Sequence, residues 1–427
     1  MRLSYAFAPA LLLALLVSAC DTAQGPSLYD PVERGTLRQK PDPTVTSISP
    51  APGQALAGVT TLTITGQNFV VGRDSAFQMV DGVRRPALKD STYVYFNGKR
   101  VPVLTVTPTA ITLRAPNMVS STLQVKVSTI GAENFSPTRV YGLLAAVERV
   151  GDTKKNEQPI GMTTDAAGAT YVSVLVGGAP GGIRKTNTAG QDSLYAPSAS
   201  TYAGLAFSPQ TGGLMAVRNG RRLYQIVRGV GEQTFLDLPG NVRLRAIDAD
   251  EAGNLWVGGS NGVAFYRVAP DKSLLTVPYA GANVLAIEAR AGFVYVSAIV
   301  AGAHKVVRFA LSGGTVGAVE DVFDVTANLP GVQVNALAFA ANGDLFLGTN
   351  RAKDPVLQIR VGTTRAESLY PDLLVIDTAP GAPGVVALSW GPGNLLHAAG
   401  AEITAVKTSL DAIGDVIRIN TLRQGEP

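Results

Sequence analysis

The feature that most constrains this chain is a phrase that recurs six times after residue 150. Each copy has a small residue, an apolar residue, a short polar gap, a glycine and a hydrophobic run, as in Ala246-Ile-Asp-Ala followed by Gly253-Asn-Leu-Trp-Val. The glycines are Gly168, Gly212, Gly253, Gly292, Gly343 and Gly393, so successive copies lie 44, 41, 39, 51 and 50 residues apart. Repetition at this period predicts a supersecondary unit that must stack against its neighbours to bury its faces.

Each copy predicts one four-stranded blade, whose first strand carries the small residue because inner strands crowd around a central axis. Six blades fit a β-propeller over residues 144–427. The repeat spacing and the Gly253-Asn-Leu-Trp-Val phrase resemble NHL-type propellers. A stacked β-solenoid is the competing topology, although repeats of about 45 residues are long for it.

The last copy is incomplete, because the chain ends soon after its third strand, Val416-Ile-Arg-Ile. An orphan strand, residues 144–150, precedes the first copy. We expect it to supply the missing outer strand of the last blade and so to close the ring.

Residues 43–141 show hydrophobic alternation of period two, which predicts short, half-buried strands and a β-sandwich. The ordered elements resemble the IPT/TIG family, an immunoglobulin-like fold. They are Ile48-Ser-Pro, Ile64-Thr-Gly-Gln-Asn-Phe, the Phe96-Asn-Gly hairpin and Ala115-Pro. The fold class is therefore all-β, an immunoglobulin-like sandwich followed by a propeller. The resemblance implies a spacer or interaction module.

The connection Val70–Thr92 is longer than is usual in that family and predicts an inserted hairpin or loop. It could be a contact loop, since rigid sandwiches often display binding loops, or a tolerated surface insertion.

The N-terminus has the pattern of an export signal. Arg2 is followed by the apolar stretch Ala6–Val17 and by Leu16-Val-Ser-Ala-Cys20, which resembles a bacterial lipoprotein signal. The resemblance implies a signal peptide at 1–19, a lipid on Cys20, a flexible tether at 20–42 and a place in the bacterial cell envelope, in either leaflet. An ordinary secretory signal is the alternative, and the apolar stretch is too short for a transmembrane helix.

Composition argues against several other classes of protein. The net charge is +4 and no Lys/Arg run exceeds two residues, so we expect no nucleic-acid partner. The two histidines, His304 and His397, fall at non-equivalent repeat positions, and no phosphate loop or nucleophile elbow occurs. We therefore expect no catalytic residue, no metal and no cofactor. The acidic group at Asp248, Asp250 and Glu251 is interpreted as a solvated turn.

The aligned first strands predict a ligand-binding rim around the propeller channel. Three positions before each small residue the side chains are mostly polar, and none is a carboxylate. The predicted rim is Gln158, Tyr202, Arg243, Arg245, Asn283, Gln333 and Asn335. Arginines and amides suit a sugar or a carboxylate better than a hard metal ion, which prefers carboxylate oxygens. The alternatives are that the polar groups only satisfy loop backbone and that Tyr202 belongs to the interblade core.

Together these features predict a lipid-anchored, extracytoplasmic, non-enzymatic binding or scaffold protein with a carbohydrate or protein ligand. Lipoproteins that join TIG and NHL-type domains resemble surface glycan-binding accessories, which favours carbohydrate. The alternative is an enzyme of the gluconolactonase or lyase type, for which the resemblance implies a divalent ion held in the channel by Glu, Asn and Asp.

Overall fold

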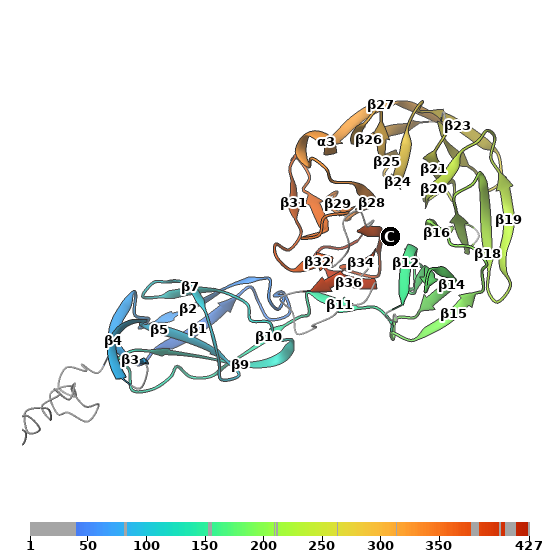
Figure 1. Ribbon diagram of the computed structural model, residues 1–427. Helices are drawn as coiled ribbons and strands as arrows, with labels where there is room; N and C mark the ends of the chain where they lie inside the picture. Colours follow the sequence, from blue (N-terminus) through green and yellow to red (C-terminus); the bar gives the residue numbers. More distant parts are fainter. Residues whose placement is uncertain are drawn as a thin grey trace, which may run out of the picture. The chain divides into compact units, whose positions relative to one another are not determined.

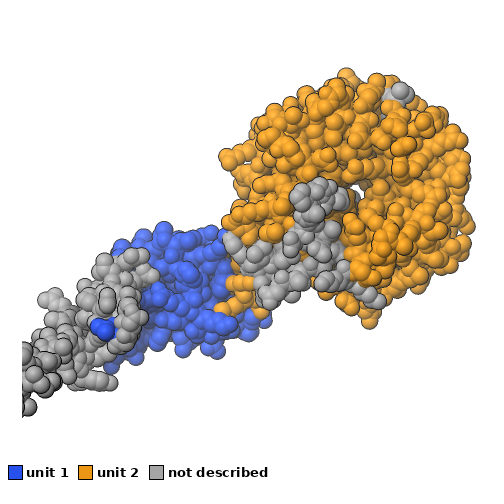
Figure 2. All heavy atoms as spheres, viewed as in Figure 1, with its two compact units in different colours: residues 1–53, 61–116, 120–142 blue, residues 54–60, 117–119, 143–427 orange. Residues whose placement is uncertain are grey.

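The computed structural model describes residues 40–80, 83–152, 156–208, 210, 212–262, 264–312, 314–376, 384–400, 403–405 and 416–425. The chain forms two compact units, coloured in Figure 2. Unit 1 is Met1–Gly53, Thr61–Pro116 and Ser120–Gly142, and unit 2 is Gln54–Thr60, Asn117–Val119 and Leu143–Pro427. The predicted signal peptide, Cys20 and the tether up to residue 39 lie outside the described residues.

Unit 1 is a β-sandwich of two four-stranded antiparallel sheets. One sheet has the order β1 (Thr44–Ser49), β2 (Thr61–Gln67), β8 (Ala110–Arg114) and β7 (Val103–Val106). The other has the order β10 (Arg139–Leu143), β9 (Ser120–Thr129), β5 (Thr92–Phe96) and β6 (Lys99–Val101). Alternate residues are buried, as in β5, where Thr92, Val94 and Phe96 are buried and the residues between them are half-buried, and Ile64 and Ile111 are fully buried. Period-two hydrophobicity therefore produces the predicted sandwich.

Two turn features of this unit follow the sequence prediction. The Phe96-Asn-Gly hairpin connects β5 to β6, with positive φ at Asn97 (46°) and Gly98 (77°), as a tight hairpin turn requires. The insertion forms a separate two-stranded hairpin of β3 (Arg73–Val80) and β4 (Val83–Asp90). The long connection is therefore ordered β-structure.

Unit 2 is a propeller of six four-stranded blades arranged around an axis (Figure 1). The blades, each from its inner to its outer strand, are as follows. Blades 1 to 3 are β12 (Glu157–Thr164), β13 (Thr170–Val176), β14 (Ala179–Thr186) and β15 (Asp192–Ala196); β16 (Gly204–Ser208), β17 (Gly213–Val217), β18 (Arg222–Val227) and β19 (Gly231–Asp237); and β20 (Arg243–Ala249), β21 (Leu255–Ser260), β22 (Ala264–Val268) and β23 (Leu274–Pro278). Blades 4 and 5 are β24 (Asn283–Arg290), β25 (Phe293–Val300), β26 (Ala303–Ser312) and β27 (Thr315–Asp324); and β28 (Val334–Phe339), β29 (Leu345–Thr349), β30 (Val356–Ile359) and β31 (Ala366–Ser368).

Blade 6 is built from both ends of the unit. Its strands are β33 (Val385–Trp390), β34 (Leu395–Gly400), β36 (Val416–Asn420) and β11 (Val147–Arg149). The outermost strand, β11, is antiparallel to β36, with Glu148 opposite Arg418 and a 2.6 Å ion pair between these two side chains. The orphan strand thus takes the predicted outer position, although it is shorter than residues 144–150, and each inner strand packs against the next around the full circle.

Several elements of unit 2 lie outside the blade pattern. Leu56 is fully buried in the hydrophobic core of this unit, beside Ala146 and Val147, and its segment makes a parallel bridge to Leu144. A two-stranded sheet joins β32 (Leu374–Ile376) to β35 (Ile403–Ala405). The short helix α3 (Val325–Asn328) begins at Asp324, whose side chain caps it. No helix within the described ranges has the length and hydropathy needed to cross a membrane.

Candidate functional site

The repeated small residue lies where neighbouring inner strands approach each other closely. A Cβ atom on Gly161 would lie 2.7 Å from the carbonyl oxygen of Tyr202, and one on Gly204 would lie 2.8 Å from the carbonyl oxygen of Arg245. Both distances are to backbone atoms, so the neighbour cannot simply rotate away. Crowding around the axis therefore explains why each copy carries a residue no larger than alanine here.

A β-bulge precedes the small residue in five of the six inner strands. The pairing register shifts by one residue there, which leaves one extra residue on the inner strand. The extra residues are Ile160, Arg245, Leu285, Asn335 and Val386, and Ala203 holds the same position before β16. All six line the central channel.

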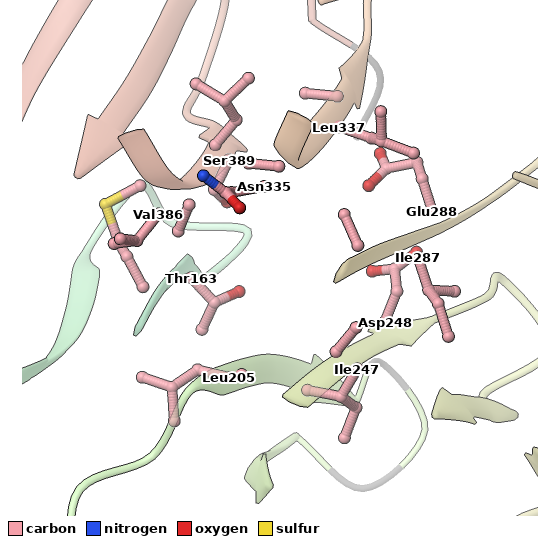
Figure 3. A pocket seen from close by; sticks show the side chains of 18 of the residues that line it. Thr163, Leu205, Ile247, Asp248, Ile287, Glu288, Asn335, Leu337, Val386 and Ser389 are labelled. Carbon is pink, nitrogen blue, oxygen red and sulfur yellow. The ribbon is translucent and has the colours of Figure 1, made fainter. Parts of the chain in front are cut away.

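The channel is a cavity of about 410 Å³ lined by residues of all six inner strands. Figure 2 shows an opening through unit 2, and Figure 3 shows the lining side chains. Because the inner strands run side by side, equivalent residues of successive copies form levels along the axis. Three such levels line the cavity.

The first level is the ring of bulge residues, in which Arg245 is the charged member. Its Nη2 donates a 3.1 Å hydrogen bond to Oδ1 of Asn335, which is 4% exposed. Burial lowers the pKa of the Arg245 guanidinium. Within the part of the chain that the structure describes, no carboxylate forms an ion pair with Arg245. The ring therefore presents a partly desolvated cation held by one amide.

The second level is apolar. It consists of the residues that directly follow the small residue, each at most 9% exposed: Met162, Leu205, Ile247, Ile287, Leu337 and Leu388. Several of them also belong to the cores between blades, such as Ile247 and Ile287. This level provides an apolar collar between two polar levels.

The third level carries two carboxylates on adjacent strands, Asp248 of β20 and Glu288 of β24. Burial raises the pKa of Asp248 to about 6, against the hydrogen bonds it accepts from the backbone of Ala289 and Ala249. Burial, with the charge of Asp248, raises the pKa of Glu288 well above its usual 4.5. Figure 3 shows both carboxylates on one side of the pocket, with Thr163 and Ser389 across from them. Both carboxyls therefore hold a proton more tightly than they would in water.

The structure brings only two of the predicted rim residues, Arg245 and Asn335, to the channel lining. Gln158, Arg243, Asn283 and Gln333 are not among the lining residues, and Arg243 and Gln333 are exposed to solvent. The two residues that line the channel are bulge residues, whereas the four that do not all lie upstream of the bulge position in the sequence.

The placement of Tyr202 at the rim is wrong. Tyr202 is fully buried in the core between blades, where its ring packs against Tyr224 at a centroid distance of 6.1 Å. Its hydroxyl oxygen lies 2.5 Å from a carboxylate oxygen of Glu232. An aromatic ring of this size gains more from burial between blades than from exposure at a channel mouth.

The channel lining contains two carboxylates, Asp248 and Glu288, that lie outside the predicted carboxylate-free rim, and the interpretation of Asp248 as part of a solvated turn is wrong. Asp248 is half-buried in the lining and is not part of a solvated turn. Its neighbour Asp250 is the turn residue, and it accepts bonds from the backbone of Asn254 at 2.8 Å and from Trp256 Nε1 at 2.9 Å. The sequence does carry a signal for this level of the channel. Two residues after the small residue, four of the six copies have a polar side chain: Thr163, Asp248, Glu288 and Ser389.

The lining does not fit a metal-dependent propeller enzyme well. Hard divalent ions take six to eight oxygen ligands, several of them carboxylate. The channel offers two carboxylates, and the described residues contain no group of three or more His, Cys, Asp or Glu that could hold a metal ion. We therefore derive no chemistry from a metal here.

The comparisons with known proteins give one family match and several distant structural neighbours. The IPT/TIG domain model matches residues 43–141, and no curated protein sequence matches the chain. Solved structures with similarity include an auxiliary nutrient binding protein from Bacteroides thetaiotaomicron (9% identity, 90% of this chain and 96% of that chain, TM-score 0.46). A second is a gluconolactonase from Xanthomonas campestris (13% identity, 64% of this chain and 89% of that chain, TM-score 0.48). A third is virginiamycin B lyase from Staphylococcus aureus (16% identity, 66% of this chain and 99% of that chain, TM-score 0.44).

The propeller itself is established by the strand pairing of this chain, with six four-stranded sheets around one axis. The chain thus combines an IPT/TIG domain at residues 43–141 with a six-bladed β-propeller.

Proposed function

We propose that this protein binds a small carbohydrate in the propeller channel and does not transform it. The observation that carries the proposal is the third level of the channel, where polar side chains from four blades line one cavity. Thr163, Asp248, Glu288 and Ser389 supply hydroxyl and carboxyl groups there. The hydroxyl groups of a sugar are both donors and acceptors, and a mixed set of this kind can satisfy them.

The apolar surfaces of the channel suit the same class of ligand. The collar of apolar residues lies next to the third level. Phe207 and Trp390, which directly follow the third-level position in their strands, also line the cavity. A sugar ring has C–H faces that pack on apolar and aromatic side chains while its edges form hydrogen bonds. A cavity of about 410 Å³ is within the roughly 300–1,000 Å³ typical of small-molecule sites.

The test is calorimetric titration of the full-length protein with a panel of mono- and disaccharides. We expect saturable binding that is lost in an Asp248→Asn, Glu288→Gln double variant. Asp271→Asn, on an exposed turn, is the matched control and should bind as the wild type does. A panel without any binder, together with a protein captured by cross-linking, would instead assign the chain to the protein-interaction scaffolds.

The location belongs to the same proposal and rests on the N-terminal sequence. Lipidation of Cys20 would hold the protein on the membrane of the cell envelope, facing away from the cytoplasm. A Cys20→Ser variant should leave the membrane fraction. Labelling of intact cells with a membrane-impermeant reagent would identify the leaflet. Retention of the Cys20→Ser variant in the membrane would contradict this mode of anchoring.

Catalysis is the second candidate function, and the carboxylate pair is the observation that favours it. Two neighbouring carboxyls with raised pKa values are the groups that general acid–base chemistry uses. The test is incubation of the panel sugars and their lactones with the protein, followed by product analysis. Turnover that disappears in Glu288→Gln would make the protein an enzyme, whereas unchanged ligands would support simple binding.

A further inference from the structure

The first level of the channel carries a charge that the protein itself does not neutralise. Arg245 is the bulge residue of β20, and its guanidinium has five N–H donors, one of which bonds to Asn335. Arg222, Arg308 and Arg418, on outer parts of the blades, each form an ion pair with a carboxylate on the neighbouring strand. Arg245 has no such partner among the described residues, although it is more buried than Arg222.

The acidic level does not neutralise this charge by contact. Asp248 is three residues further along the same strand, which places its Cα roughly 10 Å from that of Arg245 at about 3.3 Å per residue. The apolar collar, including Ile247 and Leu337, lies between the two levels. Keeping a cation in a partly dry channel without a counter-ion is costly. A ligand that brings one negative charge to this level removes that cost.

We infer that the ligand is a monoanionic sugar acid, whose carboxylate binds Arg245 while its hydroxyl groups reach the level of Asp248 and Glu288. This inference rests on the proposed carbohydrate-binding function and specifies its substrate class. The planar guanidinium matches a carboxylate with two parallel hydrogen bonds.

The charge of the lining favours a single negative charge over a double one. The channel carries one arginine at the first level and a carboxylate pair at the third, so a dianion such as a phosphate would meet only one cation and repulsion from the acidic end. A carboxylate on a polyhydroxylated ring places its charge at one end and its neutral hydroxyls at the other. This distribution matches the two polar levels of the channel.

The experiment compares acidic with neutral sugars of the same ring. The full-length protein is titrated with D-glucuronate, D-galacturonate, D-glucose and D-galactose. We expect the acids to bind more tightly than the neutral sugars. In Arg245→Gln the acids should lose about 10- to 100-fold in affinity, as expected for hydrogen bonds between charged groups, while any affinity for neutral sugars changes little.

The matched control is Arg243→Gln, which removes an exposed arginine from the same strand two residues away. It should keep the preference for acids within about twofold of the wild type. Arg245→Lys, which keeps the charge but loses the paired geometry, should fall between wild type and Arg245→Gln. Thermal unfolding of each variant verifies that it is folded.

The outcomes separate the two proposals. Equal binding of acidic and neutral sugars, or a preference for acids that survives in Arg245→Gln, overturns the assignment of Arg245 and leaves carbohydrate binding in place. The absence of binding by all four sugars and by the wider panel overturns both.

Discussion

Arg245 on β20 donates a 3.1 Å hydrogen bond to Asn335 on β28, past β24, the inner strand that lies between them around the ring. Both are bulge residues, at which the pairing register of the inner strand shifts by one residue. The bond therefore links blades 3 and 5 at the channel and depends on a backbone irregularity that these blades share.

The first prediction concerns the stability of the unliganded protein. Arg245→Met replaces a partly desolvated cation by an apolar chain of similar length, so we expect the free energy of unfolding to rise by about 1 kcal/mol. Urea unfolding without ligand measures the change, and Arg243→Met is the exposed control. A loss of stability in Arg245→Met alone would show that the arginine has a structural role.

The second prediction concerns pH. The pKa of Asp248 is about 6 in the folded protein, above its ordinary 3.8, so the folded state holds a proton that the unfolded state releases between these values. Stability should therefore fall as pH rises from about 4 to about 6, by at most about 3 kcal/mol. Glu288, whose pKa is also raised, acts in the same direction, and Asp250 and Arg290 are the charged neighbours that modulate the pair.

An Asp248→Asn, Glu288→Gln double variant should lack this slope and should be more stable than the wild type at pH 7. Melting temperatures between pH 4 and pH 7 measure the difference between the two proteins. Asp271→Asn is the control. The pKa of the exposed Asp271 is lowered in the folded protein, so this carboxylate makes stability rise with pH, and its removal should not abolish the fall caused by Asp248 and Glu288. A constant difference between wild type and double variant at all pH values would contradict the raised pKa values.

The third prediction concerns the small residue of the repeat. Gly204→Ala places a methyl group 2.8 Å from the carbonyl oxygen of Arg245 and 2.9 Å from Ile247, so we expect a loss of about 1–3 kcal/mol. Gly220→Ala is the control, because nothing lies within 4 Å of its Cβ position. Equal stability of the two variants in urea would mean that the inner strands can separate without cost.

The fourth prediction concerns closure of the ring. Deletion of residues 415–427 removes β36, which joins β11 to β34, so the propeller should lose its cooperative thermal transition. Removing only residues 426–427 is the control and should leave the transition unchanged. A melting temperature near that of the wild type after the longer deletion would show that the ring does not depend on this seam.

Much of the fold could be predicted from the sequence because its signals are local. The position of Gly98 in a hairpin, the alternation in β5 and the recurrence of one phrase each reflect backbone preferences and strand periodicity over a few residues. The incomplete last copy and the orphan strand before the first predicted the pairing of β11 with β36. The segment around Leu56, which is buried in the core of unit 2, carries no comparable signal, since its environment is set by residues distant in sequence.

The sequence by itself determined the repeat, the number of blades and the place of the seam, because these depend on strand period and on the count of strands. Only the tertiary structure decided what the channel presents. Bulges depend on the pairing between strands, and each one reverses the direction of the side chains that precede it. The bulges place Arg245 and Asn335 in the channel lining, where they bond to each other, and the packing of adjacent inner strands brings Asp248 and Glu288 together as the acidic level of the channel.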